Sequence, residues 1–207
     1  MMAFLYSYAF IIGVLIVATL LLKAGWLKDE GSRKFIHIAV AHWFILAIHT
    51  FESAYAASIV PFSFIILNWL SWRFTLVRAM ERTKQENEGL GTVYYALSLT
   101  IITFIAFRYD SLDAGLFAIL AMGYGDGLSA LVGKHFGKKT VYRKKTYIGS
   151  SVMFGCTMAI GFLLFPSRIG SVLLIALGAT ALEMFTKDGF DNLSVPLFIF
   201  FLSVVIL

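Results

Sequence analysis

An aspartate with a glycine on either side is the residue in this chain whose setting most clearly suggests chemistry. Segment 123–139 reads GYGDGLSALVGKHFGKK, so Asp126 lies between Gly125 and Gly127 where an apolar run meets a basic loop. Glycine lets the backbone turn sharply and approach a ligand closely, and a carboxylate is a hard oxygen ligand for a cation. Three ammonium groups that could bind phosphate follow: Lys134, Lys138 and Lys139. The segment predicts a phosphate or metal site at a membrane surface.

Two familiar phosphate-binding motifs do not describe this segment. A P-loop needs four residues between its two glycines, but only three separate Gly133 from Gly137, and no Ser or Thr follows Lys138. The dinucleotide-binding fingerprint also fails, because its spacing and its strand-rich α/β setting are both missing from the sequence. The glycines therefore indicate a site for phosphate or metal without naming a known loop.

Three acidic residues lie within or beside apolar segments, where a charge is costly. Placing one in hydrocarbon costs about 2.5–3.5 kcal/mol on insertion scales, so Asp126, Glu183 and Asp191 are expected to have a function. Together they could hold Mg²⁺ against a triphosphate, because Mg²⁺ takes one or two carboxylates plus substrate phosphates and water. For Glu183 an alternative is a helix-surface ion pair with Lys187, four residues later.

A basic pair and a histidine stand at the start of the second apolar run. Arg33, Lys34 and His37 share one face of a helix and could together grip phosphate oxygens. The alternative is that the two cations only anchor the helix at the membrane surface and that His37 is an interfacial hydrogen bonder. Cys156 is the single cysteine, which excludes an intramolecular disulfide and a cysteine-based zinc site.

Membrane-spanning helices are expected to carry these residues. With 59% hydrophobic and 14% charged residues in 207, the composition is typical of an integral membrane protein. Eight segments lack Asp, Glu, Lys and Arg: Met1–Leu22, Phe35–Phe51, Ser53–Trp72, Gly89–Phe107, Ala114–Gly125, Thr146–Ser167, Ile169–Leu182 and Asn192–Leu207. Five approach or exceed the ~17–25 residues that cross a bilayer, and the three shorter ones suggest tilted or interrupted helices.

We therefore predict an all-α, polytopic transmembrane helix bundle of about seven to eight spans, with short or interrupted helices at the cytoplasmic side. Residues 1–207 would form a single membrane domain. Its cytoplasmic-facing site would be formed mainly by 33–37, 123–150 and 183–196.

The basic residues predict the orientation of the bundle. Of 17 Lys and Arg residues, all but Arg108 and Arg168 fall in alternate connections on one side. Under the positive-inside rule that side is cytoplasmic, so the site faces the nucleotides there, and eight spans place both termini outside. The compact chain without a transit-type segment favours a prokaryotic plasma membrane.

Five segments in consistent order and spacing resemble one known family. They are RKFIHI at 33–38, GTVYYAL at 91–97, GDGLSALVGKHFGKK at 125–139, KKTYIGS at 144–150 and DNLSVPL at 191–197. They are similar to motifs of the CTP-dependent lipid-alcohol kinases, which include phytol kinase, dolichol kinase and the yeast-type diacylglycerol kinase and are related to CDP-diacylglycerol synthases. Dolichol-kinase-like members tend to carry Glu where this chain has Ile148, so the resemblance leans toward a shorter isoprenoid alcohol.

The resemblance implies Mg²⁺-assisted transfer of the γ-phosphate of CTP to the hydroxyl of a membrane lipid alcohol, such as phytol, geranylgeraniol, a polyprenol or diacylglycerol. On this hypothesis Asp126, Lys145 and His37 are catalytic, and either Asp126 or His37 takes the alcohol proton. The metal is bound by Asp126, Asp191 and Glu183. The nucleotide is bound by Arg33, Lys34, Gly125, Gly127, Lys134, Lys138, Lys139, Lys144, Thr146, Gly149, Ser150 and Asn192. The expected partners are CTP, the alcohol and the bilayer, with no nucleic acid.

Two other functions are open from the sequence. A cytidylyltransferase would attack the α-phosphate of CTP and release pyrophosphate, as CDP-diacylglycerol synthases do. A transporter would use intramembrane carboxylates to carry a cation through short or interrupted helices. The six basic residues from Lys134 to Lys145 favour a nucleotide enzyme, because a cation pathway does not need them.

Overall fold

The computed structural model describes residues 1–74, 90–142, 145–187 and 189–207, and it is about 85% helical. The elements in chain order are α1 (Met2–Lys23), α2 (Asp29–Ala41), α3 (Trp43–Thr50), α4 (Ala54–Phe74), α5 (Gly91–Arg108), α6 (Leu112–Phe136), β1 (Thr140–Tyr142), β2 (Lys145–Thr146), α7 (Tyr147–Leu164), the short 3₁₀ helix η2 (Pro166–Arg168), α8 (Ile169–Phe185) and α9 (Asp191–Ile206). The all-α bundle predicted from the apolar runs is confirmed.

The lengths of the helices match those needed to cross a membrane. In the described ranges, six helices are long and apolar enough by length and composition: α1, α4, α5, α6, α7 and α8 together with η2. Helix α9 is apolar but has only 16 residues, and the second apolar run is divided between α2 and α3. The run Ala114–Gly125 lies inside the 25-residue helix α6, which takes in charged residues at both of its ends. The chain is thus a multi-pass membrane protein.

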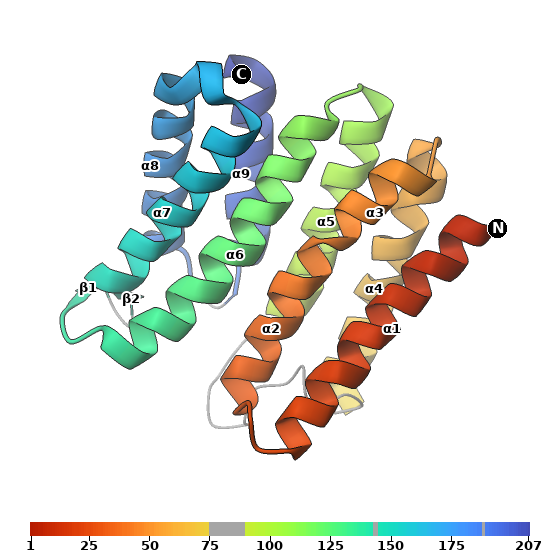
Figure 1. Cartoon of the computed structure of the whole chain (residues 1–207), viewed down its shortest axis with the longest axis horizontal. Coiled ribbons are helices and arrows are strands. Elements are labelled where there is room, and N and C mark those ends of the chain that lie inside the picture. The colour runs from red at the N-terminus through yellow and green to blue at the C-terminus, as the bar shows by residue number, and fades with distance from the viewer. Residues whose placement is uncertain (75–89, 143–144, 188) are drawn as a thin grey trace.

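The division between α2 and α3 falls at His42. Its backbone N–H donates to the carbonyl of Ala39 at 3.1 Å, three residues back, which tightens the helix locally. The His42 ring lies between two partners: Nδ1 is 3.0 Å from the Ile38 carbonyl oxygen, and Nε2 is 3.1 Å from the Tyr124 hydroxyl of α6. The two helices therefore follow one another as a single rod held against α6 (Figure 1).

The connections alternate between the two ends of the bundle. Figure 1 shows the α1–α2 link, the β1–β2 hairpin and the α8–α9 turn at one end, with the N- and C-termini at the other. The first end carries Lys23, Lys28, the lysines around the hairpin and Lys187, whereas Arg108 and Arg168 lie at the second. Among the described residues the charge distribution is two-sided as the sequence predicted, while Arg78, Arg82, Lys84, Arg143 and Lys144 lie outside them. We call the first end the basic end.

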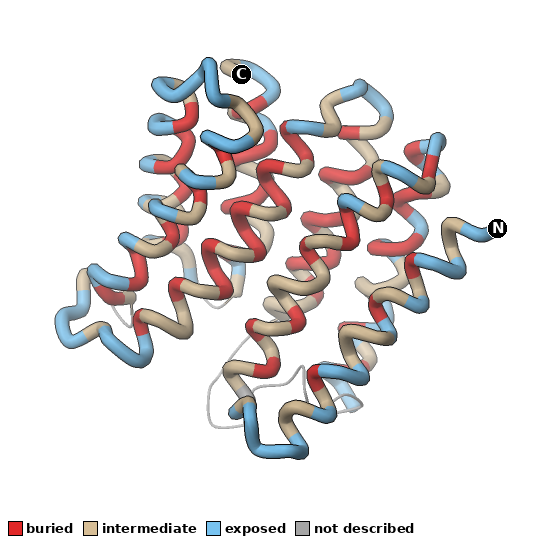
Figure 2. Tube along the Cα trace, in the orientation of Figure 1, coloured by how far each residue is buried: buried red, intermediate tan, exposed pale blue. Residues whose placement is uncertain are grey.

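Helix α6 runs through the centre of the bundle, packed against α2, α7 and α9. Its Phe117, Ile119 and Met122 are fully buried, while large apolar side chains such as Leu20 of α1 and Leu174 of α8 are exposed on outer helices. Figure 2 shows the buried residues along α6 and on inward-facing surfaces. An apolar exterior of this extent is suited to lipid contact.

Three glycines of α6 allow the close helix packing around it. Any Cβ at Gly123, Gly125 or Gly127 would lie closer than 3.0 Å to a neighbouring side chain; these neighbours are Ala41, Met153 and Ile38 respectively. All three glycines lie inside the helix, so the backbone makes none of the turns that glycine would permit there. The glycines instead let α2 and α7 approach α6 on either side of Asp126.

Candidate active site

The carboxylate of Asp126 lies inside the bundle beside two basic side chains of α2. Asp126 is 4% exposed, and Lys34 Nζ donates to its Oδ2 at 2.5 Å. His37 Nε2 lies 3.5 Å from the same oxygen. Lys34 and His37 are three residues apart, so α2 presents both on one face. The predicted basic and histidine face thus meets the predicted carboxylate.

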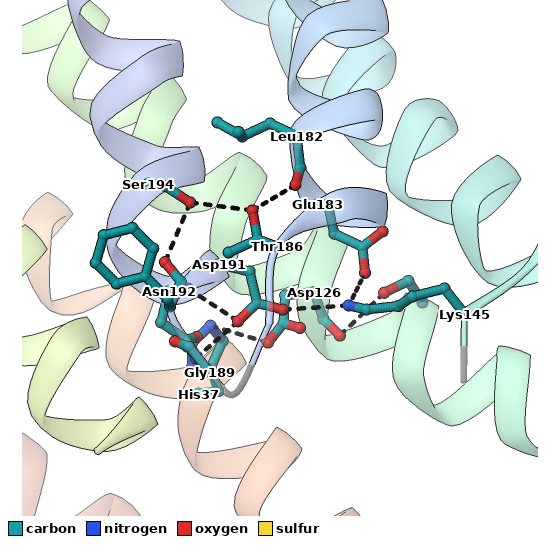
Figure 3. Close-up of polar contacts among 12 residues, drawn as sticks. His37, Asp126, Lys145, Leu182, Glu183, Thr186, Gly189, Asp191, Asn192 and Ser194 are labelled. Atoms are coloured by element: carbon teal, nitrogen blue, oxygen red, sulfur yellow. Dashed lines mark hydrogen bonds and ion pairs between the residues drawn. The ribbon is translucent and has the colours of Figure 1, made fainter. Parts of the chain in front are cut away.

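A second cluster joins β2 to α8 and α9. Lys145 Nζ contacts Glu183 Oε1 and donates to Asp191 Oδ2 at 3.1 Å (Figure 3). Glu183 is only 2% exposed. The partner of Glu183 is therefore Lys145, and not Lys187 as the local ion-pair alternative had it. Two of the three predicted acidic residues share one lysine.

The two clusters adjoin each other near the basic end of the bundle. Asp126 and Lys145 are close enough to influence each other electrostatically, and Figure 3 shows them side by side. We define the candidate active site as the six residues of the two clusters: Lys34, His37, Asp126, Lys145, Glu183 and Asp191. These residues come from five separate elements of the chain.

The ammonium of Lys145 is held in its charged form. Burial lowers the pKa of Lys145, but the carboxylates of Asp191 and Glu183 raise it by more, so the pKa lies above the ordinary lysine value. Its side chain is 30% exposed, compared with 7% for Lys34. Lys145 is thus the lysine of the site that an incoming anion could reach.

Thr146 and Gly149 fix the position of Lys145 at the start of α7. The Thr146 hydroxyl oxygen caps that helix by accepting a hydrogen bond from the Gly149 N–H at 3.1 Å. Gly149 packs closely on α6, where a Cβ would lie 3.0 Å from the Ser129 carbonyl oxygen. Both residues therefore have a structural role, and their predicted contact with a nucleotide stays a prediction.

A glycine turn positions Asp191 and Asn192 at the start of α9. Gly189 has a φ of 79°, and a Cβ there would lie 2.8 Å from the Cα of Gly91, the first residue of α5. The Asn192 side-chain amide donates to the Gly189 carbonyl at 3.0 Å, and its backbone N–H donates to Asp191 Oδ1 at 3.1 Å. This turn directs the other carboxylate oxygen of Asp191 toward Lys145.

Tyr95 and Gly91 belong to the surroundings of the site, although neither was assigned a role from the sequence. The Tyr95 ring lies against the His37 ring with centroids 3.9 Å apart, and its hydroxyl donates to the His37 carbonyl oxygen at 3.2 Å. Both residues lie in the GTVYYAL segment. The family motif therefore marked the right segment, but nothing in its residue types pointed to these contacts.

Two buried polar atoms of the site have no hydrogen-bond partner within the described parts of the chain. They are His37 Nε2 and Glu183 Oε2; Asn192 Oδ1, next to Asp191, and Ser150 Oγ of α7 are also unpaired. The 3.5 Å approach of His37 to Asp126 is therefore an electrostatic contact and not a hydrogen bond. Other unpaired buried polar atoms lie elsewhere in the described chain, but those of His37, Glu183 and Asn192 lie among charged side chains, where a polar ligand could pair with them.

The oxygen atoms of the site fit Mg²⁺ bound together with a phosphate ligand. Among the residues that the structure describes, no group of three or more His, Cys, Asp and Glu side chains could hold a metal alone. Mg²⁺ needs only one or two carboxylates, because phosphates and water complete its coordination. Glu183 Oε2 and Asn192 Oδ1 are unpaired hard oxygen atoms, whereas Lys34 already occupies Asp126 Oδ2. Mg²⁺ binding stays a prediction.

Other basic residues assigned to the nucleotide lie at the surface or in a different ion pair. Lys134, Lys138 and Lys139 are exposed at the end of α6 and before β1. Arg33 donates to Glu30 in the first turns of α2 at 2.6 Å. Lys144 lies outside the described residues. The structure thus brings Lys34 and Lys145 into the site and leaves the contacts predicted for the others untested.

Comparison with known proteins gives three similar sequences. The chain is 28% identical over 197 residues to a phytol kinase of Synechocystis sp., covering 89% of this chain and 82% of that protein. It is 29% identical over 198 residues to a probable chloroplastic phytol kinase of Triticum aestivum, covering 82% of this chain and 65% of that protein. It is 28% identical over 203 residues to probable phytol kinase 2, chloroplastic, of Oryza sativa subsp. japonica, covering 86% of this chain and 66% of that protein. The chain thus spans about two thirds of each plant protein. No protein-family model and no solved structure matches it.

Proposed function

We propose that this chain, a homologue of the phytol kinases, is a membrane phosphotransferase that transfers the γ-phosphate of CTP to the hydroxyl of an isoprenoid alcohol. The relatives agree with the family resemblance seen in the sequence, and their names support an alcohol as acceptor. CTP as the donor comes from the resemblance. The observation that carries the proposal is the candidate active site near one end of a lipid-facing bundle, in which Lys34 pairs with buried Asp126 and Lys145 pairs with buried Glu183 and Asp191.

Lys145 is the residue proposed to bind the transferred phosphate. Phosphoryl transfer depends mainly on positioning and on neutralising the charge that develops on the phosphate oxygens. Lys145 is partly exposed and already oriented by Glu183 and Asp191, so its ammonium loses little conformational freedom on binding phosphate. Lys34 is buried and instead holds Asp126 in place. Mg²⁺ held by Glu183 and its neighbours would neutralise further phosphate charge.

His37 is the residue proposed to take the proton of the alcohol. Its Nε2 is buried in the site without a hydrogen-bond partner in the described chain, whereas Oδ2 of Asp126 is occupied by Lys34. As the alcohol oxygen forms its bond to the γ-phosphorus and the bond to CDP breaks, Nε2 receives the proton. The Asp126 carboxylate, 3.5 Å away, stabilises the imidazolium that results. Asp126 is then a positioning residue for His37.

The acceptor is proposed to reach the site sideways from the bilayer while the nucleotide arrives from water. The basic end is taken to face the cytoplasm, where CTP is present, because basic connections stay on that side of a membrane. A prokaryotic plasma membrane is compatible with the cyanobacterial relative.

Transfer of labelled phosphate tests this function directly. Purified protein with Mg²⁺ is incubated with phytol, geranylgeraniol, a polyprenol or diacylglycerol, and with CTP labelled at either the γ- or the α-phosphate. We expect label in the lipid from the γ position only, with phytol or geranylgeraniol as the best acceptor. Label arriving from the α position would identify a cytidylyltransferase. Absence of transfer from both positions, in protein that remains folded, would overturn the proposal.

A further inference from the structure

A lipid-facing groove lies between α4, α5 and α9, toward the end of the bundle that holds the two termini. It has a volume of about 620 Å³, and it is lined by Ser58 of α4, Thr100, Ile101, Phe104 and Tyr109 of α5, and Phe201 of α9. Tyr109 and Phe201 are exposed at its margin. None of these residues belongs to the candidate active site.

The lining of the groove presents an apolar surface. The hydroxyls of Thr100 and Ser58 are turned back on their own helices, where each donates at 2.7 Å to the carbonyl four residues earlier. The other lining residues named are aromatic or aliphatic apart from the Tyr109 hydroxyl. A surface of this kind favours a hydrocarbon ligand, because it offers little to pair with a polar one.

Two helices connect the groove with the candidate active site. Helix α9 begins at Asp191, and α5 begins at Gly91, which packs against the Gly189 turn. Along α5, the partly exposed residues Tyr94, Leu97 and Ile101 recur every three or four positions and so follow one face toward the groove. On α9, partly exposed Ser194 and Leu197 and exposed Phe201 recur at the same spacing between Asp191 and the groove.

The distance between site and groove matches the length of a lipid chain. Tyr95 of α5 lies against His37, and at about 1.5 Å of rise per residue Thr100 lies about 8 Å and Tyr109 about 21 Å along the helix from Tyr95. One leaflet of the hydrocarbon core is about 15 Å deep, half of the ~30 Å core. A chain that extends one leaflet from a hydroxyl near His37 therefore reaches well into the groove, whereas a chain of about half that length reaches only its near edge.

We infer that the groove between α4, α5 and α9 binds the distal part of the acceptor's hydrocarbon chain and sets the preference for chain length. This inference rests on the proposed function and adds to it a binding site for the end of the chain. It gives the acceptor a preferred path along α5 and α9, with its hydroxyl near Lys145 and His37. The chain enters laterally, since the groove is open to the bilayer.

Filling the groove tests the inference. In Thr100→Phe, the added ring should lower kcat/KM for geranylgeraniol relative to geraniol by about tenfold, the equivalent of about two buried methylene groups. The KM for CTP should not change, because Thr100 is remote from the phosphates. The matched control is Thr180→Phe on α8, whose hydroxyl makes the same bond at 2.7 Å to the carbonyl of Ala176. It should leave the ratio unchanged.

A second variant covers the case in which Thr100→Phe does not fold. Phe201→Ala removes an exposed side chain at the groove margin and should lower the same ratio in protein of unaltered thermal stability. An equal effect on both alcohols in either folded variant, or no effect, would overturn the inference while leaving the kinase activity standing. If the parent protein phosphorylates no alcohol, the proposed function itself fails, so the two failures are distinguishable.

Discussion

Lys145 Nζ lies 3.1 Å from Asp191 Oδ2, although 46 positions separate the two residues in the chain. The same ammonium contacts Glu183, so that β2, α8 and α9 are held together by one cation. The positive charge that neutralises both carboxylates therefore comes from a residue distant in the sequence. A substitution at Lys145 therefore changes both the charge offered to phosphate and the contacts among three elements.

Replacing Lys145 should separate these two effects. Lys145→Met is expected to lower phosphate transfer at least about 100-fold and to reduce the melting temperature, because each hydrogen bond to a charged group contributes about 1.5–3 kcal/mol. Lys145→Arg keeps the charge and should restore most of the melting temperature but only part of the activity. Both quantities are measured on the same detergent-purified samples. Full activity in folded Lys145→Met would exclude the phosphate-binding role.

The raised pKa of Lys145 predicts how its contribution to stability depends on pH. A lysine whose pKa is higher in the folded protein stabilises it fully below the ordinary lysine value of about 10.4, and the stabilisation is lost only as the pH rises through the folded value. The difference in melting temperature between the parent and Lys145→Met should therefore stay constant from about pH 7 to about pH 10. A difference that grows as the pH rises across this range would show that Lys145 loses its proton more easily in the folded protein than in the unfolded chain, and would contradict the raised pKa.

Asp126 and Lys34 should behave as a coupled pair. Asp126→Asn is expected to lower turnover at least about 100-fold, because His37 loses the charge that stabilises its protonated form. Adding Lys34→Met to Asp126→Asn should lower turnover much less than Lys34→Met lowers it in the parent, since the effects of substitutions in one ion pair are not additive. Kinetics of the two single variants and the double variant measure the coupling.

Asp113→Asn is the control for Asp126→Asn, because it makes the same change at an exposed position in the first turn of α6. It should leave turnover within a few-fold of the parent. Strictly additive losses for Asp126 and Lys34 would contradict the geometry of the pair.

The glycine beside Asp126 should matter for packing and not for contact with the nucleotide. Gly125→Ala places a methyl group against Met153 and is expected to lower stability by about 1–3 kcal/mol, the usual cost of overpacking. Gly155→Ala in α7 has open space around it and should be neutral or stabilising by up to about 1 kcal/mol. Shortening the neighbour in Gly125→Ala/Met153→Ala should recover activity lost in Gly125→Ala. No recovery in the stable double variant would favour a direct role of Gly125 at the nucleotide.

The sequence predicted which residues carry the chemistry better than it predicted their partners. Asp126, Glu183 and Asp191 could be recognised because an acid in an apolar segment is costly unless it is used. The contact between Lys145 and Glu183 could not, because it joins residues 38 positions apart, and the nearby Lys187 offered a plausible local pair. The packing role of Gly125 and Gly127 could not be predicted either, because glycine has low helix propensity and only the neighbouring helices show that a small residue is required inside α6.

The turn before α9 offers the sharpest test of how the site is assembled. Gly189→Ala would place a side chain at a positive φ and within 2.8 Å of the Gly91 backbone. Gly25→Ala is a matched control, because Gly25 has a φ of 73° but open space around it in the α1–α2 link. The strain alone costs about 1–2 kcal/mol in both variants. Only Gly189→Ala should also displace Asn192 and Asp191, and so lower turnover by at least about tenfold at a temperature where both variants remain folded. Equal turnover in the two variants would show that the packing of Gly189 on Gly91 does not position the acidic residues for catalysis.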